Sequence, residues 1–413
     1  MRRPHFGTVD CIQPALSTPT RHPRSLEIAL VTETYPPEVN GVAMTIGRIV
    51  AGLLERGHRI DVVRPRQHPS EQPCRTAQLE EMLVRGMVIP CYDSLKLGFP
   101  STAALRSRWT QRRPDVVHVT TEGPLGWSAL RAARALGLPV AADFHTNFHS
   151  YCEHYGAGWL RQPVIGYLRR FHGRVHCTMV PTQGLRTELE RLRFRDLTVV
   201  ARGVDTALFH PARRSQDLRA LWGAAPADPV VLYVGRLAPE KNLPLALEAY
   251  EAMRTVQPRV RLVIVGDGPD RASLQQRARS AVFAGLRNGT DLATHYASAD
   301  VFLFPSVTET YGNVTVEAMA SGLAVVAYDY AAAAEHIRHE RNGIAVPYGD
   351  RAAFVQLAAG LTIDRSRFVR LGRNARVSTE RLDWTRIVAE FERTLLALVA
   401  KEDEDELAPC LPA

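Results

Sequence analysis

Two glutamates, Glu309 and Glu317, stand eight positions apart with Gly312 in the loop between them. The apolar run VFLFPS (301–306) comes just before this pair and is typical of a buried strand. The residues after Gly312 predict a helix, whose first backbone amides (311–315) would form an anion site. Carboxylates accept hydrogen bonds from ribose and sugar hydroxyls, so the stretch suits a nucleotide-sugar. A helix-capping glutamate beside a solvated one is the structural alternative.

Two cations, Arg236 and Lys241, follow another apolar run, PVVLYVG (229–235). A forked guanidinium and a mobile ammonium together suit a diphosphate, although two solvated surface cations would give the same pattern. No GxxxxGK[ST] motif accompanies them, so they are not part of a P-loop. The GxG in GDGPDRA (266–272) has Arg271 where a dinucleotide fingerprint needs its third glycine, and a nicotinamide cofactor is therefore not expected.

These residues follow predicted strands of an α/β protein. Short apolar runs alternate with helical patterns such as the one at 44–58, which is the βαβ rhythm of doubly wound parallel sheets. The runs lie at 26–32, 59–65, 115–121, 138–145, 229–235, 260–266, 300–306 and 323–329. Segment 201–217 has no long apolar face and is expected to be the hinge. Because ligands bind beyond the carboxyl ends of such strands, we expect two Rossmann-like domains facing each other across a cleft that holds the site.

A length of 413 residues predicts two domains, and 46% apolar with 23% charged residues is typical of a globular protein. We expect a disordered leader at 1–25, an N-terminal domain at 26–205, a C-terminal domain at 206–383 and a disordered acidic tail at 401–413. The net charge of +8 favours anionic membranes or phosphorylated substrates. Nucleic acid is not expected as a partner, because no nucleic-acid-binding motif is present.

The six cysteines contain no CxxC pair, which predicts neither a zinc site nor a disulfide framework and fits a reducing cytoplasm. No apolar stretch reaches the roughly 18–20 residues of a membrane span. The segment 159–176 predicts instead a basic amphipathic helix that could lie on an anionic leaflet. Its apolar residues at helical spacing are Leu160, Val164, Tyr167, Leu168 and Phe171, and the cations around them are Arg161, Arg169, Arg170 and Arg174. A helix packed on its own sheet is the alternative.

Taken together, the motifs resemble the retaining glycosyltransferases of family 4, which have the GT-B fold. The resemblance covers about 26–398 and rests most on the two glutamates and the AMASGLAVVA that follows, supported by VGRLAPEKN, ARGVDTALFHP, IVGDGP and HYASADVFLFPS in order. VTETYPPEVNGVA and DFHTNFHSY are most similar to bacterial GDP-mannose-dependent α-mannosyltransferases, followed by sulfoquinovosyl- and glucosyl-diacylglycerol synthases. The GT-B fold implies a C-terminal helix, at about 384–400, that crosses back to the N-terminal domain.

The resemblance implies roles for the candidate residues. The donor-binding set is Gly41, Arg236, Lys241, Glu309, Gly312, Asn313, Val314 and Glu317, and the catalytic set is Glu309, His145, Arg236 and Lys241. In these roles the two cations hold the diphosphate, Glu317 binds the ribose and Glu309 contacts the hexose at its 3-hydroxyl. Gly41 closes over the diphosphate, and His145 lies near the hexose 6-hydroxyl. The stretch YAAAAEHI (330–337) keeps Glu335 but has alanines where many relatives have two glycines, so it carries no inference about the substrate.

The implied reaction moves a hexose, with mannose favoured, from a nucleoside-diphosphate sugar to a lipid or glycan hydroxyl with retention of configuration. No cofactor or metal is expected, because no DxD follows a predicted strand. The partners are then a GDP-mannose or UDP-sugar donor, the acceptor and an anionic membrane, in the cytoplasm or on the inner face of the plasma membrane. A UDP-sugar-dependent diacylglycerol glycosyltransferase and a non-catalytic sugar-nucleotide-binding protein are the alternatives. An epimerase or phosphorylase of the same fold is a weaker one, since no pyridoxal-binding lysine environment is evident.

Overall fold

The structure, a computed structural model, describes residues 25–38, 40–89, 92–145 and 161–407. The first part contains β1 (Glu27–Val31), α1 (Gly41–Glu55), β2 (Arg59–Pro65), β3 (Leu79–Val84), β4 (Gly86–Ile89), β5 (Tyr92–Gly98), α2 (Thr102–Gln111), β6 (Val116–Val119), α3 (Pro124–Ala135), β7 (Val140–Asp143), α5 (Arg161–His172), β8 (Cys177–Val180), α6 (Gln183–Arg191) and β9 (Leu197–Val199). Its parallel sheet has the order β3-β2-β1-β6-β7-β8-β9, and β4 and β5 pair separately as an antiparallel hairpin.

The second part begins with η2 (Pro211–Arg213). It continues with α7 (Gln216–Leu221), β10 (Val230–Val234), η3 (Pro239–Lys241), α8 (Leu243–Val256), β11 (Arg261–Val265), α9 (Arg271–Arg277), β12 (Val282–Gly285), α10 (Gly289–Ala297), β13 (Val301–Phe304), α11 (Asn313–Ala320), β14 (Ala324–Tyr328), α12 (Ala331–His336), β15 (Ile344–Val346), α13 (Arg351–Ile363), α14 (Arg365–Thr379) and η4 (Glu380–Leu382). Its parallel sheet has the order β12-β11-β10-β13-β14-β15. In both sheets the strand order reverses beside the first strand, as in Rossmann folds.

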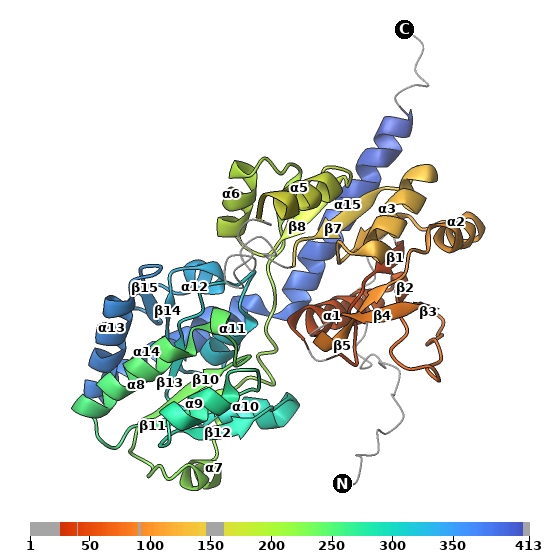
Figure 1. The fold of residues 1–413 in the computed structure, drawn as a ribbon. Coiled ribbons are helices and arrows are strands. Elements are labelled where there is room, and N and C mark those ends of the chain that lie inside the picture. Colours follow the sequence, from red (N-terminus) through yellow and green to blue (C-terminus); the bar gives the residue numbers. More distant parts are fainter. Residues whose placement is uncertain (1–24, 39, 90–91, 146–160, 408–413) are drawn as a thin grey trace.

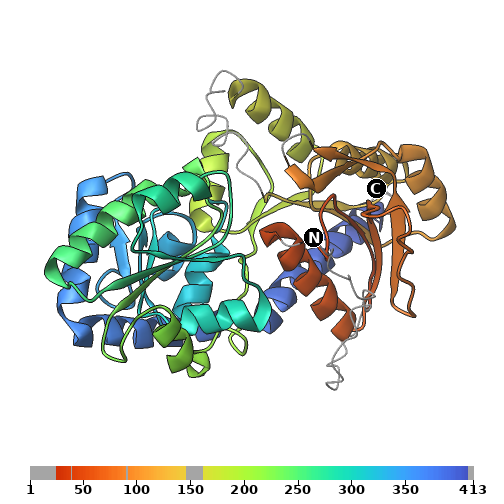
Figure 2. The same cartoon turned by 60° about the horizontal axis from the view of Figure 1, so that its bottom comes forward.

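The predicted α/β class with two doubly wound sheets is therefore confirmed, and Figures 1 and 2 show the two halves as separate lobes. Strands β1, β6, β10, β13 and β14 are almost wholly buried, because helices cover both faces of each sheet. Burial on both faces explains why these strands read as continuous apolar runs in the sequence.

The last helix, α15 (Trp384–Leu407), crosses back and packs on the first domain, as expected. Its residues Ile387, Val388, Phe391 and Leu395 join the core that α1 and β1 form. A Cβ at Gly52 of α1 would lie 2.6 Å from a methyl carbon of Val388, so the two helices are in close contact. Figure 1 shows α15 running the length of the first lobe.

Two expectations about the ends of the chain need correction. α15 continues to Leu407, so residues 401–407 are helical rather than part of a disordered tail. A charge run does not end a helix that tertiary packing has already stabilised, and Glu and Lys are good helix formers. Ser25, placed in the leader, donates a hydrogen bond to the carbonyl of Gly57 at 2.7 Å. Residues 1–24 and 408–413 lie outside the described part of the chain.

The expectation that the cysteines are unpaired is also wrong. Cys74 is disulfide-bonded, whereas Cys177 is free and buried. The partner of Cys74 lies outside the described residues. The spacing rule used for the sequence detects only CxxC pairs, and a disulfide outside such a pair leaves no signal of this kind. The cysteines therefore no longer support a reducing compartment.

Candidate functional site

Lys241 and Glu309 come together at the strand reversal of the second sheet, and Arg236 lies on the same loop as Lys241. Strands β10 and β13 are hydrogen-bonded neighbours, so the loops that follow them meet. Lys241 Nζ donates a hydrogen bond to Glu309 Oε1, and Ser306 Oγ donates to the same oxygen at 2.8 Å. Arg236 is exposed at the end of β10, whereas the Lys241 and Glu309 side chains are each 14% exposed. The site thus presents one exposed guanidinium beside a partly buried ion pair.

The loop that carries Arg236 is held by close backbone packing. The motif IVGDGP supplies the glycines for it: a Cβ at Gly266 (φ 134°) would lie 1.9 Å from the carbonyl oxygen of Gly235. A Cβ at Gly268 would lie 2.3 Å from the carbonyl oxygen of Leu237. The amide of Leu237 also donates to Asp267 O at 2.9 Å. These glycines therefore allow the backbone after β11 to pack closely against the loop that carries Arg236.

The second glutamate lies on α11, just after the expected helix N-terminus. Gly312 caps this helix with φ 89°, a left-handed conformation that favours glycine. Asn313 Oδ1 is buried and has no hydrogen-bond partner within the described part of the chain. Glu317 Oε2 accepts a hydrogen bond from Tyr296 at 3.0 Å. Burial raises the pKa of Glu317 to about 7, against the effect of that hydrogen bond.

The first domain meets this helix at Gly41. A Cβ at Gly41 would lie 3.7 Å from Asn313 Nδ2, so the N-termini of α1 and α11 face each other across the two domains. Asn40 caps α1 by accepting from the amides of Val42 and Ala43. The structure therefore brings Gly41 close to the first residue of α11.

The predicted His145 lies between Asp143 and Arg202. Its Nε2 lies 2.9 Å from Asp143 Oδ2, and its Nδ1 lies 2.8 Å from Arg202 Nη2. Asp143 also contacts His118 Nε2 at 2.9 Å. Burial opposes ionisation of Asp143, but the two histidines hold its pKa well below the usual range. His145 therefore lies at the carboxyl end of β7 with its Nδ1 hydrogen-bonded to Arg202, whereas its Nε2 is buried near Asp143 without a hydrogen-bond partner among the described residues.

Sequence reasoning missed three residues of this site, namely Asp143, Arg202 and Tyr311. All three lie inside segments that carry the family resemblance. The Tyr311 hydroxyl donates to the carbonyl of Arg202 at 3.0 Å and lies 3.0 Å from His336 Nε2. No spacing rule connects these segments, because they are brought together only by the meeting of the two domains.

The stretch around Glu335 also lies between the domains. Glu335 Oε1 accepts hydrogen bonds from the amides of Gln183 at 2.8 Å and Gly184 at 3.3 Å. The Glu335 carboxylate therefore lies against the N-terminus of α6 in the other domain, where a negative charge is favourable.

The basic helix α5 is only partly as predicted. Ile165, Leu168 and Phe171 are buried in the cores of the first domain, and Val164 packs against them. The apolar side is therefore not available for a membrane, because it covers its own sheet. Arg169 and Arg170 are exposed on the outer side and Tyr167 is 45% exposed, while Leu160 lies outside the described residues. Of the predicted membrane-binding helix, only the exposed basic side with Arg169 and Arg170 remains available to an anionic membrane.

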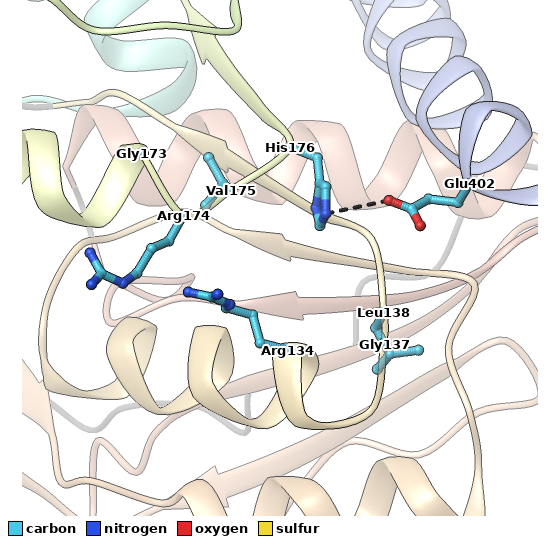
Figure 3. A pocket seen from close by; sticks show the side chains of 8 residues that line it. All are labelled: Arg134, Gly137, Leu138, Gly173, Arg174, Val175, His176 and Glu402. Atoms are coloured by element: carbon cyan, nitrogen blue, oxygen red, sulfur yellow. Dashed lines mark ion pairs between the residues drawn. The ribbon is translucent and has the colours of Figure 1, made fainter. Parts of the chain in front are cut away.

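A cavity of about 390 Å³ lies away from the site, at the opposite edge of the first sheet. Figure 3 shows its lining, with Arg134 and Arg174 beside the contact of His176 with Glu402 at 3.3 Å. A much smaller cavity of about 10 Å³ lies beside the loop that precedes α11, and Glu309 and Tyr311 line it. It holds about one water molecule rather than a sugar.

The described residues contain no cluster of three or more His, Cys, Asp or Glu side chains placed to hold a metal ion. Across the same ranges, every helix is too short or too polar to span a membrane.

Comparison with known proteins identifies the family. Residues 39–208 match the family described as Glycosyltransferase Family 4, and residues 228–364 match Glycosyl transferases group 1. A GDP-mannose-dependent alpha-mannosyltransferase of Mycobacterium tuberculosis (strain CDC 1551 / Oshkosh) is 35% identical over 331 residues, which are 79% of this chain and 85% of the relative. An alpha-monoglucosyldiacylglycerol synthase of Streptococcus pneumoniae (strain ATCC BAA-255 / R6) is 26% identical over 316 residues, 73% of this chain and 71% of the relative.

Among solved structures, sucrose-phosphate synthase from Thermosynechococcus elongatus superposes with a TM-score of 0.75 at 19% identity, over 91% of this chain and 100% of that chain. This likeness, with the two parallel-sheet domains, confirms the expected GT-B fold. The two family matches lie one on each domain, and the identity to the mycobacterial relative spans both. The chain belongs to glycosyltransferase family 4.

Proposed function

We propose that this glycosyltransferase moves a hexose, with mannose favoured, from a nucleoside-diphosphate sugar to a hydroxyl of a lipid or glycolipid, with retention of configuration. The observation that carries the proposal is the meeting of Lys241 and Glu309 at the strand reversal, opposite Gly41. The name of the mycobacterial relative supports GDP-mannose as donor. The name of the streptococcal relative supports a diacylglycerol-based acceptor.

In this proposal Arg236 and Lys241 bind the diphosphate. Arg236 is exposed and can offer its forked donors to phosphate oxygens. Lys241 has three donors, so it can keep its contact with Glu309 while it binds a phosphate oxygen. The backbone amides of Gly312, Asn313 and Val314 begin α11, where a negative charge is favourable.

Glu309 and Glu317 take the two sugars of the donor. Glu309 sits beside Lys241, so it would face the hexose next to the diphosphate. Glu317 lies deeper along α11, where its carboxylate can accept hydrogen bonds from the ribose diol. His145 approaches the hexose from the other domain.

The proposed chemistry is a front-face displacement. The bond between the anomeric carbon and the diphosphate oxygen breaks, and the bond to the acceptor oxygen forms on the same face. The acceptor proton passes to the departing diphosphate. The protein then contributes positioning and stabilisation of the leaving-group charge, which Arg236, Lys241 and the first amides of α11 supply.

The acceptor proposal includes a membrane surface. Arg161, Arg169, Arg170 and Arg174 belong to α5 or the turn after it, and the outer side of this helix is basic. Near-surface cations favour anionic lipids by about 1 kcal/mol each. We propose that the protein works in the cytoplasm and binds the inner leaflet through this charged side.

The test is a transfer assay with the full chain. Radiolabelled GDP-mannose, UDP-glucose and UDP-glucuronate are each incubated with diacylglycerol and with extracted lipids, and the labelled products are separated. Labelled lipid from GDP-mannose alone supports the proposal, and labelled lipid from a UDP-sugar alone favours the diacylglycerol glycosyltransferase alternative. Donor binding without transfer or donor hydrolysis would overturn the enzymatic role and leave a sugar-nucleotide-binding protein.

A further inference from the structure

Arg202 is a buried cation in the segment that joins the two domains. The residue is 7% exposed, yet the described residues place no carboxylate within ion-pair distance of it. Burying a charge without a direct partner is costly, so the position calls for a functional explanation. Arg219 shows the purely structural case: it is fully buried, but it pairs with Asp300 at 3.1 Å and donates to three backbone carbonyls.

The Arg202 guanidinium is directed at an imidazole. Its Nη2 donates to His145 Nδ1 at 2.8 Å. A guanidinium has no acceptor, so Nδ1 must carry the lone pair in this contact. The ring proton is then on Nε2, which lies 2.9 Å from Asp143 Oδ2. The hydrogen bond from Arg202 thus specifies a neutral His145 in a single tautomer.

The same arginine reaches the other domain at residues 305–312, between β13 and α11, which we call the donor loop. Its guanidinium carbon lies 5.8 Å from the centroid of the Tyr311 ring, and its backbone carbonyl accepts from the Tyr311 hydroxyl at 3.0 Å. Tyr311 directly precedes Gly312, the cap of α11. One residue therefore contacts both the histidine of the first domain and the loop that begins the donor site.

We propose that Arg202 is a positioning residue for sugar transfer, which holds His145 as the neutral Nε2–H tautomer and ties this ring to the donor loop through Tyr311. The inference rests on the proposed function for its catalytic consequence. Its structural content, the state of the imidazole, can be measured without any substrate.

The charges around His145 give the direction of the effect. Burial lowers the pKa of His145 most, Asp143 and Glu122 raise it, and Arg202 lowers it. His118 faces the same Asp143, and Glu309 and Tyr311 face Arg202 from the second domain. Removing the guanidinium leaves the ring beside carboxylates without an opposing cation. The pKa of His145 should therefore rise.

Histidine NMR on the full chain tests the state of the ring. His145→Asn identifies the His145 resonances in ¹⁵N-labelled protein. In the wild type we expect the Nε2–H pattern, with the neutral form persisting below the usual histidine range. In Arg202→Met we expect the titration to move up by about one pH unit or more. Should Arg202→Met fail to fold, Arg202→Gln removes the same charge and gives the same readout.

Kinetics test the consequence for transfer. Arg202→Met should lower kcat by about 10- to 100-fold, because the ring is no longer held, while donor KM stays within about twofold. The acid limb of the pH–rate profile should move up with the His145 titration. Arg202→Lys, which keeps the charge, should recover part of kcat. In a His145→Asn background, Arg202→Met should add little further loss.

Arg219→Met is the matched control, because it removes a buried arginine far from His145. It should lower the melting temperature and leave the acid limb in place. An unchanged His145 titration in Arg202→Met, or fully additive losses in the double variant, would overturn the inference. A wild-type chain that transfers no sugar would overturn the proposed function instead, and the NMR result would still stand.

Discussion

At the residue scale, the carboxylates of Glu309, in the loop before α11, and of Glu317, on α11, are placed in different surroundings. Glu309 is paired with Lys241 and accepts from Ser306, which keeps its charge compensated. Among the described residues, Glu317 accepts a side-chain hydrogen bond from Tyr296 alone, and burial raises its pKa to about 7. The surroundings therefore suit Glu309 to a charged reacting centre and Glu317 to a set of hydroxyl donors.

Glu317→Gln should raise donor KM by about 10- to 100-fold, because hydrogen bonds to a charged acceptor are lost. Wild-type donor KM should fall as pH rises from 6 to 8, as the carboxylate forms, and this dependence should be absent in the variant. The folded-state pKa of Glu317 is raised, so its contribution to stability is present below the unfolded pKa and is lost as pH rises through about 7. The melting temperature of the variant should consequently fall less between pH 5 and 8.

Glu309→Gln, in the loop that precedes α11, serves as the comparison. It should lower kcat more than it raises donor KM, because a carboxylate near the hexose favours the positive charge that develops at the anomeric carbon. The opposite outcome, with kcat lost only in Glu317→Gln and KM raised only in Glu309→Gln, would mean that the two roles are reversed.

Arg236→Ala and Lys241→Ala should each lower kcat/KM by about 10- to 100-fold, the worth of a charged hydrogen bond. Steady-state kinetics with the preferred donor measure this. Arg254→Ala is the control, since Arg254 pairs with Glu251 and lies over the Tyr250 ring on the surface of α8, away from the site. If kcat/KM of both site variants stays within twofold of wild type, Arg236 and Lys241 do not bind the diphosphate.

Transfer should persist after chelation. The site offers Arg236, Lys241 and the first amides of α11 as positive groups for the leaving diphosphate, and no DxD follows a predicted strand. Activity is measured with excess EDTA and again after addition of Mg²⁺ or Mn²⁺. Loss on chelation with recovery by either ion would contradict the metal-free mechanism.

At the scale of elements, α15 binds the first domain through both apolar contact and a buried charge cluster. Glu392 is 1% exposed, with Arg56 Nη2 at 2.5 Å and His58 Nε2 at 2.6 Å. Burial works against the charge of Glu392, but Arg56 and His58 outweigh it and lower its pKa. The ionised carboxylate of Glu392 therefore helps to hold α15 on the first domain, and it is neutralised only in acid.

Glu392→Gln should destabilise the protein by about 3 kcal/mol, the lower end for breaking a buried pair, because Arg56 is partly exposed. Chemical denaturation measures the free energy of unfolding. Because the folded-state pKa of Glu392 is lowered, its carboxylate stabilises the fold at pH values above the unfolded-state pKa. This contribution is lost as pH falls through the folded-state pKa, so the difference in stability between variant and wild type should shrink in acid. Glu402→Gln on the same helix breaks only an exposed contact with His176 and should change stability by less than about 0.5 kcal/mol. Equal effects of the two substitutions would show that the buried cluster contributes nothing special.

At the scale of the whole molecule, the domains meet through several contacts that involve the site. Arg48 of α1 pairs with Asp205 of the connecting segment at 2.7 Å. The two chain crossings run side by side, since the amide of Val204 donates to Leu382 O at 2.8 Å. Contacts at Gly41, Arg202 and Glu335 link the same two domains. The loop that precedes α11 is therefore in direct contact with the first domain and the connecting segment.

Binding to anionic membranes should depend on the outer side of α5. Arg169→Glu with Arg170→Glu should weaken pelleting with phosphatidylserine or phosphatidylglycerol vesicles at low salt, since each near-surface cation contributes about 1 kcal/mol. Arg370→Glu with Arg373→Glu makes the same charge change on exposed positions of α14 in the other domain. Equal pelleting of the two double variants would assign α5 to the protein core alone.

The sequence by itself determined the α/β class, most central strands and the strand ends that carry the site. These features are local: strands buried on both faces must be apolar along their whole length, and residues at their carboxyl ends share one edge of the sheet. For that reason Arg236, Lys241, Glu309 and Glu317 could be chosen before any coordinates were known. The strands β3, β4, β5, β8, β9, β12 and β15 were not predicted. β9 and β15 have only three residues each, too few to show a periodicity.

Only the tertiary structure decided which groups touch. The pairing of Lys241 with Glu309 needs β10 and β13 to be neighbours, and the contact of Arg202 with His145 needs two distant segments to meet between the domains. The apolar stripe of α5 fits a membrane or a core equally well in sequence, and packing against its own sheet settled it for the core. Periodicity shows that a side of a helix must be covered, whereas what covers it depends on contacts between residues far apart in the chain.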